Sequence, residues 1–156
     1  MIDFKIDFVE RSLENLEKYR GEYEVTNLIN YCLSLIVLPK EVCYDEISKK
    51  YYNKKIKDVD GLNFSFRGSF KSKGNEIEIK DMYVNSFLRN LRNGVAHCNI
   101  TLLGDKYDCG KKISSIKIGD KNDDFKCEIE IEDFKSLVVF IAKEYLEIYK
   151  NNNCRL

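Results

Sequence analysis

The chain has 156 residues, with 26 basic and 26 acidic side chains, so its formal net charge is zero. This length fits one domain, and we expect a single domain over residues 1–156. A neutral chain is not a globally basic nucleic-acid binder, so any contact with RNA or DNA must come from a local patch. Hydrophobic residues make up 44% of the chain and charged residues 33%, which is typical of a globular rather than a disordered protein.

Several features favour a cytoplasmic protein without membrane contact. The N-terminus lacks a basic segment followed by an apolar core, so no signal peptide is recognised. The longest apolar stretch, residues 33–38, is too short to cross a bilayer. The six cysteines are scattered without any C-x-x-C pair, which favours reduced thiols. With one histidine and no clustered thiols, we expect no metal and no cofactor.

The first part of the chain has helical periodicity. Residues 3–19 repeat apolar side chains at helical spacing, and Gly21 follows as a stop signal. Residues 22–38 predict a second, stronger helix, closed by Pro39, the only proline. Residues 40–57 predict a weaker and more polar helix.

After this segment the apolar residues no longer repeat at helical spacing but occur at every second position. Phe64, Phe66 and Phe70 alternate with polar residues, and a turn at residues 73–75 leads to a second alternating segment, which predicts a β-hairpin. Residues 81–103 return to helical period. Residues 113–118 and 125–131 predict a second hairpin, and a last helix spans Phe134 to Tyr149. We therefore expect a mainly α fold, a bundle of four to five helices with two β-hairpin insertions.

The stretch from Met82 to Ile100, MYVNSFLRNLRNGVAHCNI, carries the most chemistry. On a helix of about 100° per residue, one face gathers the apolar residues Val84, Phe87, Leu88, Leu91 and Val95. The opposite face gathers Arg89, Arg92, Asn93 and His97. Gly94 and Ala96 are small, so a partner backbone or a substrate could approach there.

This polar face permits two interpretations. A face with two arginines is usually only solvated, and a lone histidine is more often structural than catalytic. The same residues suit one reaction, however. Histidine can accept a proton near neutral pH, and arginine grips a phosphate with a fixed fork of donors. A base with a phosphate clamp fits the attack of an RNA 2′-hydroxyl on its adjacent phosphate, which needs no metal.

The six residues Arg92-Asn93-Gly94-Val95-Ala96-His97 match the R-x4–6-H motif of the HEPN superfamily, including its usual polar residue after the arginine. The string LRNGVAHCNI resembles the motif helix of bacterial HEPN nucleases. The helix ending in LIVLPKE and the hairpin at residues 113–131 also resemble such proteins. The resemblance therefore covers most of the chain and identifies it as a HEPN-like domain.

The resemblance implies a homodimeric, metal-independent endoribonuclease, acting as a toxin or as an antiphage or stress defence effector. Two copies of the motif would form one composite site. Arg92 would hold the scissile phosphate, His97 would act as acid/base or orient the 2′-hydroxyl, and Asn93 would position the motif. Arg89 is a further RNA-contact candidate, taken from the helix face rather than from the motif. The alternative is a catalytically inactive HEPN-like binding or regulatory module.

The sequence leaves the control of such an activity open. An antitoxin or another inhibitory partner is possible for a toxin of this kind. Some HEPN toxins carry a modifiable tyrosine two residues after the histidine, but this chain has Asn99 there. A second basic segment, residues 49–57, interleaves five lysines with Tyr51 and Tyr52. Such a pattern either tracks an RNA backbone or forms a solvated helix face, and we favour the solvated face.

Overall fold

The computed structural model describes residues 4–18, 24–37, 46–104 and 113–153. The main elements in chain order are α1 (Phe4–Lys18), α2 (Glu24–Cys32), β1 (Arg67–Ser72), β2 (Asn75–Glu78), α4 (Val84–Ala96), β3 (Ile100–Gly104), β4 (Ile113–Gly119), β5 (Phe125–Glu130) and α5 (Ile131–Asn153). Shorter elements are a π-helix at Leu33–Val37 and 3-10 turns at Ile56–Asp58, Asp60–Leu62 and Ile79–Asp81. Residues 46–50 are also helical.

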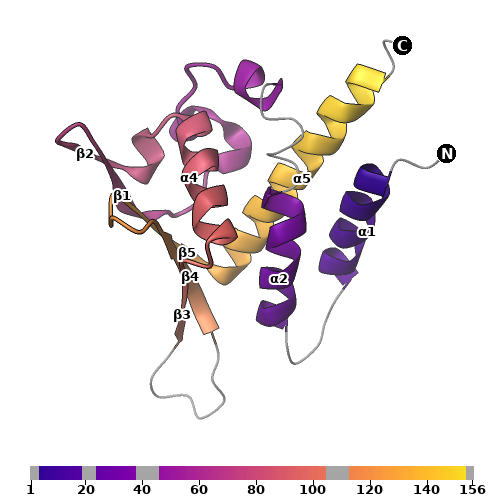
Figure 1. Ribbon diagram of the computed structural model, residues 1–156, viewed down its shortest axis with the longest axis horizontal. Helices are drawn as coiled ribbons and strands as arrows, with labels where there is room; N and C mark the ends of the chain where they lie inside the picture. Colours follow the sequence, from indigo (N-terminus) through magenta and orange to yellow (C-terminus); the bar gives the residue numbers. More distant parts are fainter. Residues whose placement is uncertain (1–3, 19–23, 38–45, 105–112, 154–156) are drawn as a thin grey trace.

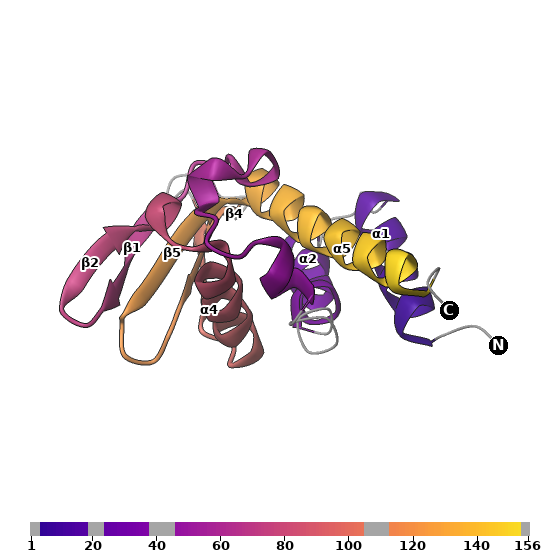
Figure 2. The same cartoon turned by 90° about the horizontal axis from the view of Figure 1, so that it is seen from above.

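The long helix α5 runs from the β-sheet at one end of the molecule to α1 at the other (Figure 1). Its start packs on β4 and β5, while α1 and α2 pack along it farther on (Figure 2). The amphipathic pattern explains this arrangement, because the apolar residues of α1 that repeat at helical spacing are the buried ones: Val9, Leu13 and Leu16. The helices predicted at residues 3–19 and 22–38 are confirmed over the described residues 4–18 and 24–37, the second continuing as a π-helix after Cys32.

The helix predicted at residues 40–57 is wrong in its extent. Residues 40–45 lie outside the described part of the chain. Helical structure covers residues 46–50, after which Asn53 adopts a left-handed conformation with φ 57°. A residue with left-handed backbone dihedral angles ends a right-handed helix. The remaining residues continue as a turn and a 3-10 segment, not as one helix.

Both predicted hairpins form. β1 and β2 join through Lys73 and Gly74, which have φ of 50° and 82°, so two successive left-handed residues make the tight turn that two-residue hairpins prefer. β4 and β5 pair from Ser115↔Glu130 to Gly119↔Lys126. Phe64 and Phe66, predicted to lie in the first strand, precede β1 and are partly buried.

The predicted fold class, a mainly α bundle with two hairpin insertions, is wrong. The hairpins merge into one five-stranded antiparallel sheet of order β2-β1-β5-β4-β3, so the fold combines α and β structure. β1 joins β5 from Arg67↔Glu128 to Phe70↔Phe125, and β3 adds to the other side of β4. A separate hairpin leaves hydrogen-bonding groups unpaired at both edges, and merging the two hairpins pairs the inner edges.

The sheet has one covered face and one solvated face. α4 and α5 cover the face that carries the buried apolar side chains of β4 and β5: Ile116, Ile118, Phe125, Cys127 and Ile129. The opposite face carries charged side chains, where Arg67 Nη2 lies 2.6 Å from Glu128 Oε1 and 3.1 Å from Glu130 Oε1. The helices therefore need only one side of the sheet to build the core.

Phe87 links α4 to the sheet through aromatic contacts. Its ring centroid lies 5.2 Å from that of Phe66 and 6.2 Å from that of Phe125, both with the rings tilted edge to face. This geometry is favourable for aromatic rings and fixes the height of α4 above β5.

Across the described residues, no helix has the length and apolar character needed to span a membrane.

Candidate functional site at the end of α4

The two faces of α4 are separated by burial. Val84, Phe87, Leu91 and Val95 are buried in the core and Leu88 is partly buried. These are the five residues of the predicted apolar stripe. Arg89 and His97 are exposed, while Arg92 and Asn93 are partly exposed. The structure therefore places Arg89, Asn93 and His97 on the side of the helix that faces away from the core, and Arg92 at its flank, where the Nε atom is buried.

The helix is shorter than the sequence predicted. It ends at Ala96, whereas helical period predicted a helix to residue 103, and residues 100–104 instead form β3. His97 is the C-terminal cap, and Cys98 turns left-handed with φ 56°. The backbone N–H of Asn99 donates to the Gly94 carbonyl (2.9 Å). The Cys98 N–H donates to the Val95 carbonyl (3.1 Å).

This pair of hydrogen bonds is the Schellman arrangement that terminates helices. A glycine usually occupies the left-handed position, but here Cys98 does, so the local sequence gave no glycine stop signal. The consequence is that His97 stands at the end of the helix, with its side chain exposed. Asn99 in turn accepts a hydrogen bond from the Gly119 N–H (3.1 Å), which ties this corner to β4.

Gly94 has a different role from the predicted one. A Cβ atom at this position would lie 2.4 Å from Ile118 Cγ2 and 2.8 Å from the Gly119 carbonyl oxygen. The backbone that approaches Gly94 is therefore β4 of the same chain, not a substrate or a partner. The glycine lets α4 lie directly on the sheet, and this close contact positions the residues on either side of it. Ala96, the other small residue, is exposed.

Arg92 and Asn93 are neighbours in space as well as in sequence. Arg92 Nη1 donates to Asn93 Oδ1 at 2.8 Å. A guanidinium is planar, so a hydrogen bond to one nitrogen restricts the orientation of the whole fork. Residues five apart differ by about 140° around a helix, so Arg92 and His97 of one chain need not point at the same atom.

The basic segment at residues 49–57 is largely paired with carboxylates. Lys50 Nζ lies 2.5 Å from Glu144 Oε2, and Lys57 Nζ lies 2.7 Å from Asp81 Oδ1. These pairs raise the pKa of both ammonium groups, chiefly through the hydrogen bonds to Glu144 and Asp81. Lys49 pairs with Glu46 at 3.2 Å. The pairing favours the solvated-face interpretation for most of this segment.

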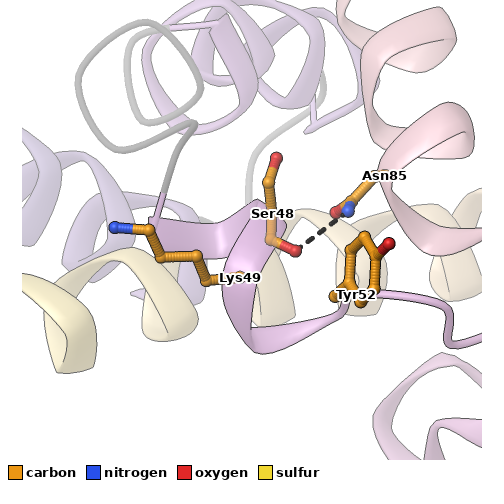
Figure 3. Close-up of a pocket in the computed structure, with 4 residues that line it drawn as sticks. All are labelled: Ser48, Lys49, Tyr52 and Asn85. Atoms are coloured by element: carbon orange, nitrogen blue, oxygen red, sulfur yellow. Dashed lines mark hydrogen bonds between the residues drawn. The ribbon is translucent and has the colours of Figure 1, made fainter.

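A cavity of about 540 Å³ opens beside the first turn of α4. The described residues that line it are Ser48, Lys49 and Tyr52, together with Asn85 of α4 (Figure 3). Sequence reasoning did not single out Asn85. It lies four residues before Arg89 and seven before Arg92, so helical spacing alone could have placed it on the arginine side of α4.

Metal and thiol chemistry receive no support from the geometry. Within the described ranges, no three His, Cys, Asp or Glu side chains are close enough to share a metal ion. Cys98 and Cys127 are free thiols, the first exposed and the second buried. Burial raises the pKa of the Cys127 thiol to about 12, so it stays protonated near neutral pH.

A family model described as HEPN pEK499 p136 matches residues 2–155. No curated protein and no solved structure matches the chain. The match includes α4 and the R-x4-H motif that the structure places at its end. The chain belongs to the HEPN pEK499 p136 family.

Proposed function

We propose that this protein is a metal-independent endoribonuclease. The chain belongs to a HEPN family, and HEPN domains are commonly ribonucleases. The observation that carries the proposal is the position of Arg92, Asn93 and His97 in the last turn and C-terminal cap of α4, where His97 is exposed and the other two are partly exposed. These are the motif residues, and none of the three is used to fill the hydrophobic core.

The proposed reaction is an internal transfer. The imidazole of His97 accepts the proton of an RNA 2′-hydroxyl, and the 2′-oxygen attacks the adjacent phosphorus. The bond from phosphorus to the 5′-oxygen of the next nucleotide breaks, and that oxygen takes up a proton. The products are a 2′,3′-cyclic phosphate and a 5′-hydroxyl. Arg92, oriented by Asn93, stabilises the charge on the phosphate oxygens through forked hydrogen bonds.

A dimer makes this chemistry easier. Because Arg92 and His97 diverge around the helix, we propose that two α4 ends face one another and form a shared cleft. Arg92 of one chain can then hold the phosphate on which His97 of the other chain acts. We expect the protein to be a homodimer at micromolar concentration. A strictly monomeric protein that still cleaves RNA would contradict the shared site.

The decisive experiment is cleavage of single-stranded RNA in excess EDTA, with analysis of the product ends. We expect cleavage to persist, to leave 2′,3′-cyclic phosphates, and to disappear on DNA or on 2′-O-methyl RNA. The control is His97→Ala, purified in the same way to exclude a contaminating nuclease. Dependence on Mg²⁺, or equal cleavage of DNA, would overturn the mechanism.

Subunit mixing tests the shared cleft separately. Arg92→Ala and His97→Ala are each expected to be inactive as homodimers. If one chain supplies the arginine and the other the histidine, mixed and re-equilibrated dimers should regain part of the activity. A mixture that stays inactive while forming heterodimers would place the complete site within one chain.

We further propose a role as a toxin or defence effector in the cytoplasm. Expression of the wild-type chain should arrest bacterial growth, whereas expression of His97→Ala should not. Restoration of growth by a co-expressed partner would identify an antitoxin, and Asn99 argues against control through a tyrosine at that position. RNA binding without cleavage in any condition would instead favour the inactive binding module.

A further inference from the structure

The cavity beside α4 combines three kinds of side chain that together suit a nucleobase. It has an exposed aromatic ring in Tyr52, polar groups in Ser48 and Asn85, and a cation in Lys49. Its volume is about 540 Å³ and it is widely open to solvent, so it suits a base that stacks at the surface rather than an enclosed ligand. Tyr52 and Asn85 lie on one side of Ser48, and Lys49 extends to the other (Figure 3).

The polar groups of the cavity are incompletely satisfied. Asn85 Nδ2 donates to the Ser48 carbonyl oxygen at 3.1 Å, which fixes the amide plane. Asn85 Oδ1 and Ser48 Oγ are both buried, and neither has a hydrogen-bond partner in the described part of the protein. A buried polar atom without a partner is costly, so a ligand group that reaches these two atoms, once the side chains that cover them shift, would be favoured. A side-chain amide is also a common reader of base edges.

Tyr52 supplies a stacking surface. Its side chain is 73% exposed, the highest value among the exposed large hydrophobic residues of the described part of the chain. The neighbouring Tyr51 is buried, so adjacent tyrosines of the same turn have opposite environments. An exposed ring next to a cavity can stack on a base with little reorganisation, because every base has a flat aromatic face.

The cavity lies in line with the proposed catalytic residues. Asn85, Arg89 and Arg92 are spaced by four and three residues, so they form one stripe along α4. Asn85 is about 10 Å from Arg92 along the helix axis. A strand whose phosphate lies at Arg92 can therefore run past Arg89 toward the cavity. The ion pair of Lys49 with Glu46 is exposed, and such pairs are weak enough to exchange for a phosphate.

We propose that this cavity is a base-binding subsite for single-stranded RNA, one or more nucleotides away from the scissile phosphate. The inference rests on the proposed ribonuclease function and gives it a source of sequence preference. Tyr52 stacks on the base, Asn85 and Ser48 contact its edge, and Lys49 contacts the backbone.

The test measures binding apart from cleavage, in the full-length His97→Ala protein. Fluorescence anisotropy with labelled A, C and U hexamers gives the affinity and the base preference. Adding Tyr52→Ala should weaken binding by about 5- to 100-fold, as expected for the loss of one stacked base. Tyr52→Phe should retain the affinity, because it keeps the ring. Adding Asn85→Ala should reduce the differences between the three hexamers.

Tyr83→Ala is the matched control, since Tyr83 is also exposed, at 51%, but does not line the cavity. Unchanged binding in Tyr52→Ala, or equal losses in Tyr52→Ala and Tyr83→Ala, would overturn the subsite. Free nucleoside monophosphates that bind as tightly as the hexamers would also overturn it, by indicating a nucleotide site. If binding depends on Tyr52 but the wild type cleaves no RNA, the result would support the subsite and contradict the proposed ribonuclease function.

Discussion

The two faces of α4 obey different constraints. The face toward the sheet is packed by Phe87, Leu91 and Val95, and Gly94 there touches the backbone of β4. The outer face carries His97, which is exposed, and Arg92, which is partly exposed. Changes on the inner face should therefore alter folding, and changes on the outer face should alter chemistry. This difference gives four tests, and a fifth concerns a buried thiol of β5 under the same core; they run from the largest expected effect to the smallest.

The largest effect is expected for His97→Ala on cleavage. Loss of general acid–base help should lower the rate by about 10²- to 10⁴-fold. The side chain is exposed at the helix cap, so the free energy of unfolding should change by no more than about 0.5 kcal/mol. RNA cleavage and urea unfolding of the same preparation check both expectations. A large loss of stability would mean that the outer face also supports the fold.

Leu91→Ala is the opposite case. Leu91 is fully buried, so truncation should leave a cavity and lower the free energy of unfolding by about 2–5 kcal/mol. Cleavage should persist wherever the variant remains folded, at reduced temperature if necessary. A loss of cleavage in a fully folded Leu91→Ala protein would break the separation of the two faces.

Arg92→Lys keeps the positive charge but loses the paired N–H donors of the guanidinium and its hydrogen bond to Asn93. The loss of one charge-assisted hydrogen bond predicts a fall in cleavage of about 10- to 100-fold. Arg89→Lys is the matched control and should have a much smaller effect. Steady-state kinetics on one RNA measures both. Equal losses in the two variants would indicate general charge attraction rather than geometry.

Gly94→Ala adds a methyl group where β4 approaches. Overpacking should cost about 1–3 kcal/mol, offset in part by the better helix propensity of alanine, about 1 kcal/mol. Ala96→Ser adds one atom at an exposed position of the same helix and should change the stability by less than about 0.5 kcal/mol. Thermal melting compares the two. A neutral Gly94→Ala would show that α4 can shift on the sheet without cost.

The smallest effect concerns alkaline pH. Burial raises the pKa of the Cys127 thiol from 9.0 to about 12, so the folded state holds its proton more tightly than the unfolded state. The corresponding stability is complete below pH 9 and is lost as the pH rises toward 12. At pH 9.5 the loss should be below about 1 kcal/mol. Urea unfolding at pH 8 and 9.5 should show a weaker pH dependence in Cys127→Ala than in the wild type. An identical dependence in both proteins would contradict this account.

Local sequence patterns predicted the elements whose signals lie within a few residues. The apolar stripe from Val84 to Val95 follows from helical spacing, and the first hairpin follows from the Lys73-Gly74 turn between alternating segments. The motif residues Arg92, Asn93 and His97 are likewise a property of the sequence alone. Each of these depends on contacts between neighbours in the chain, which a periodic pattern records directly.

The tertiary structure decided how these pieces join. The pairing of β1 with β5 connects residues about sixty positions apart, and neither strand carries a local signal for its partner. The end of α4 at Ala96 depends on a left-handed Cys98, a conformation that cysteine does not favour and that the sequence therefore does not predict. The need for glycine at position 94 arises only because β4 lies against it. The cavity between Ser48 and Asn85 joins two distant segments. Non-local pairing and close packing fixed these features, since they depend on which surfaces meet and not on the order of residues along one element.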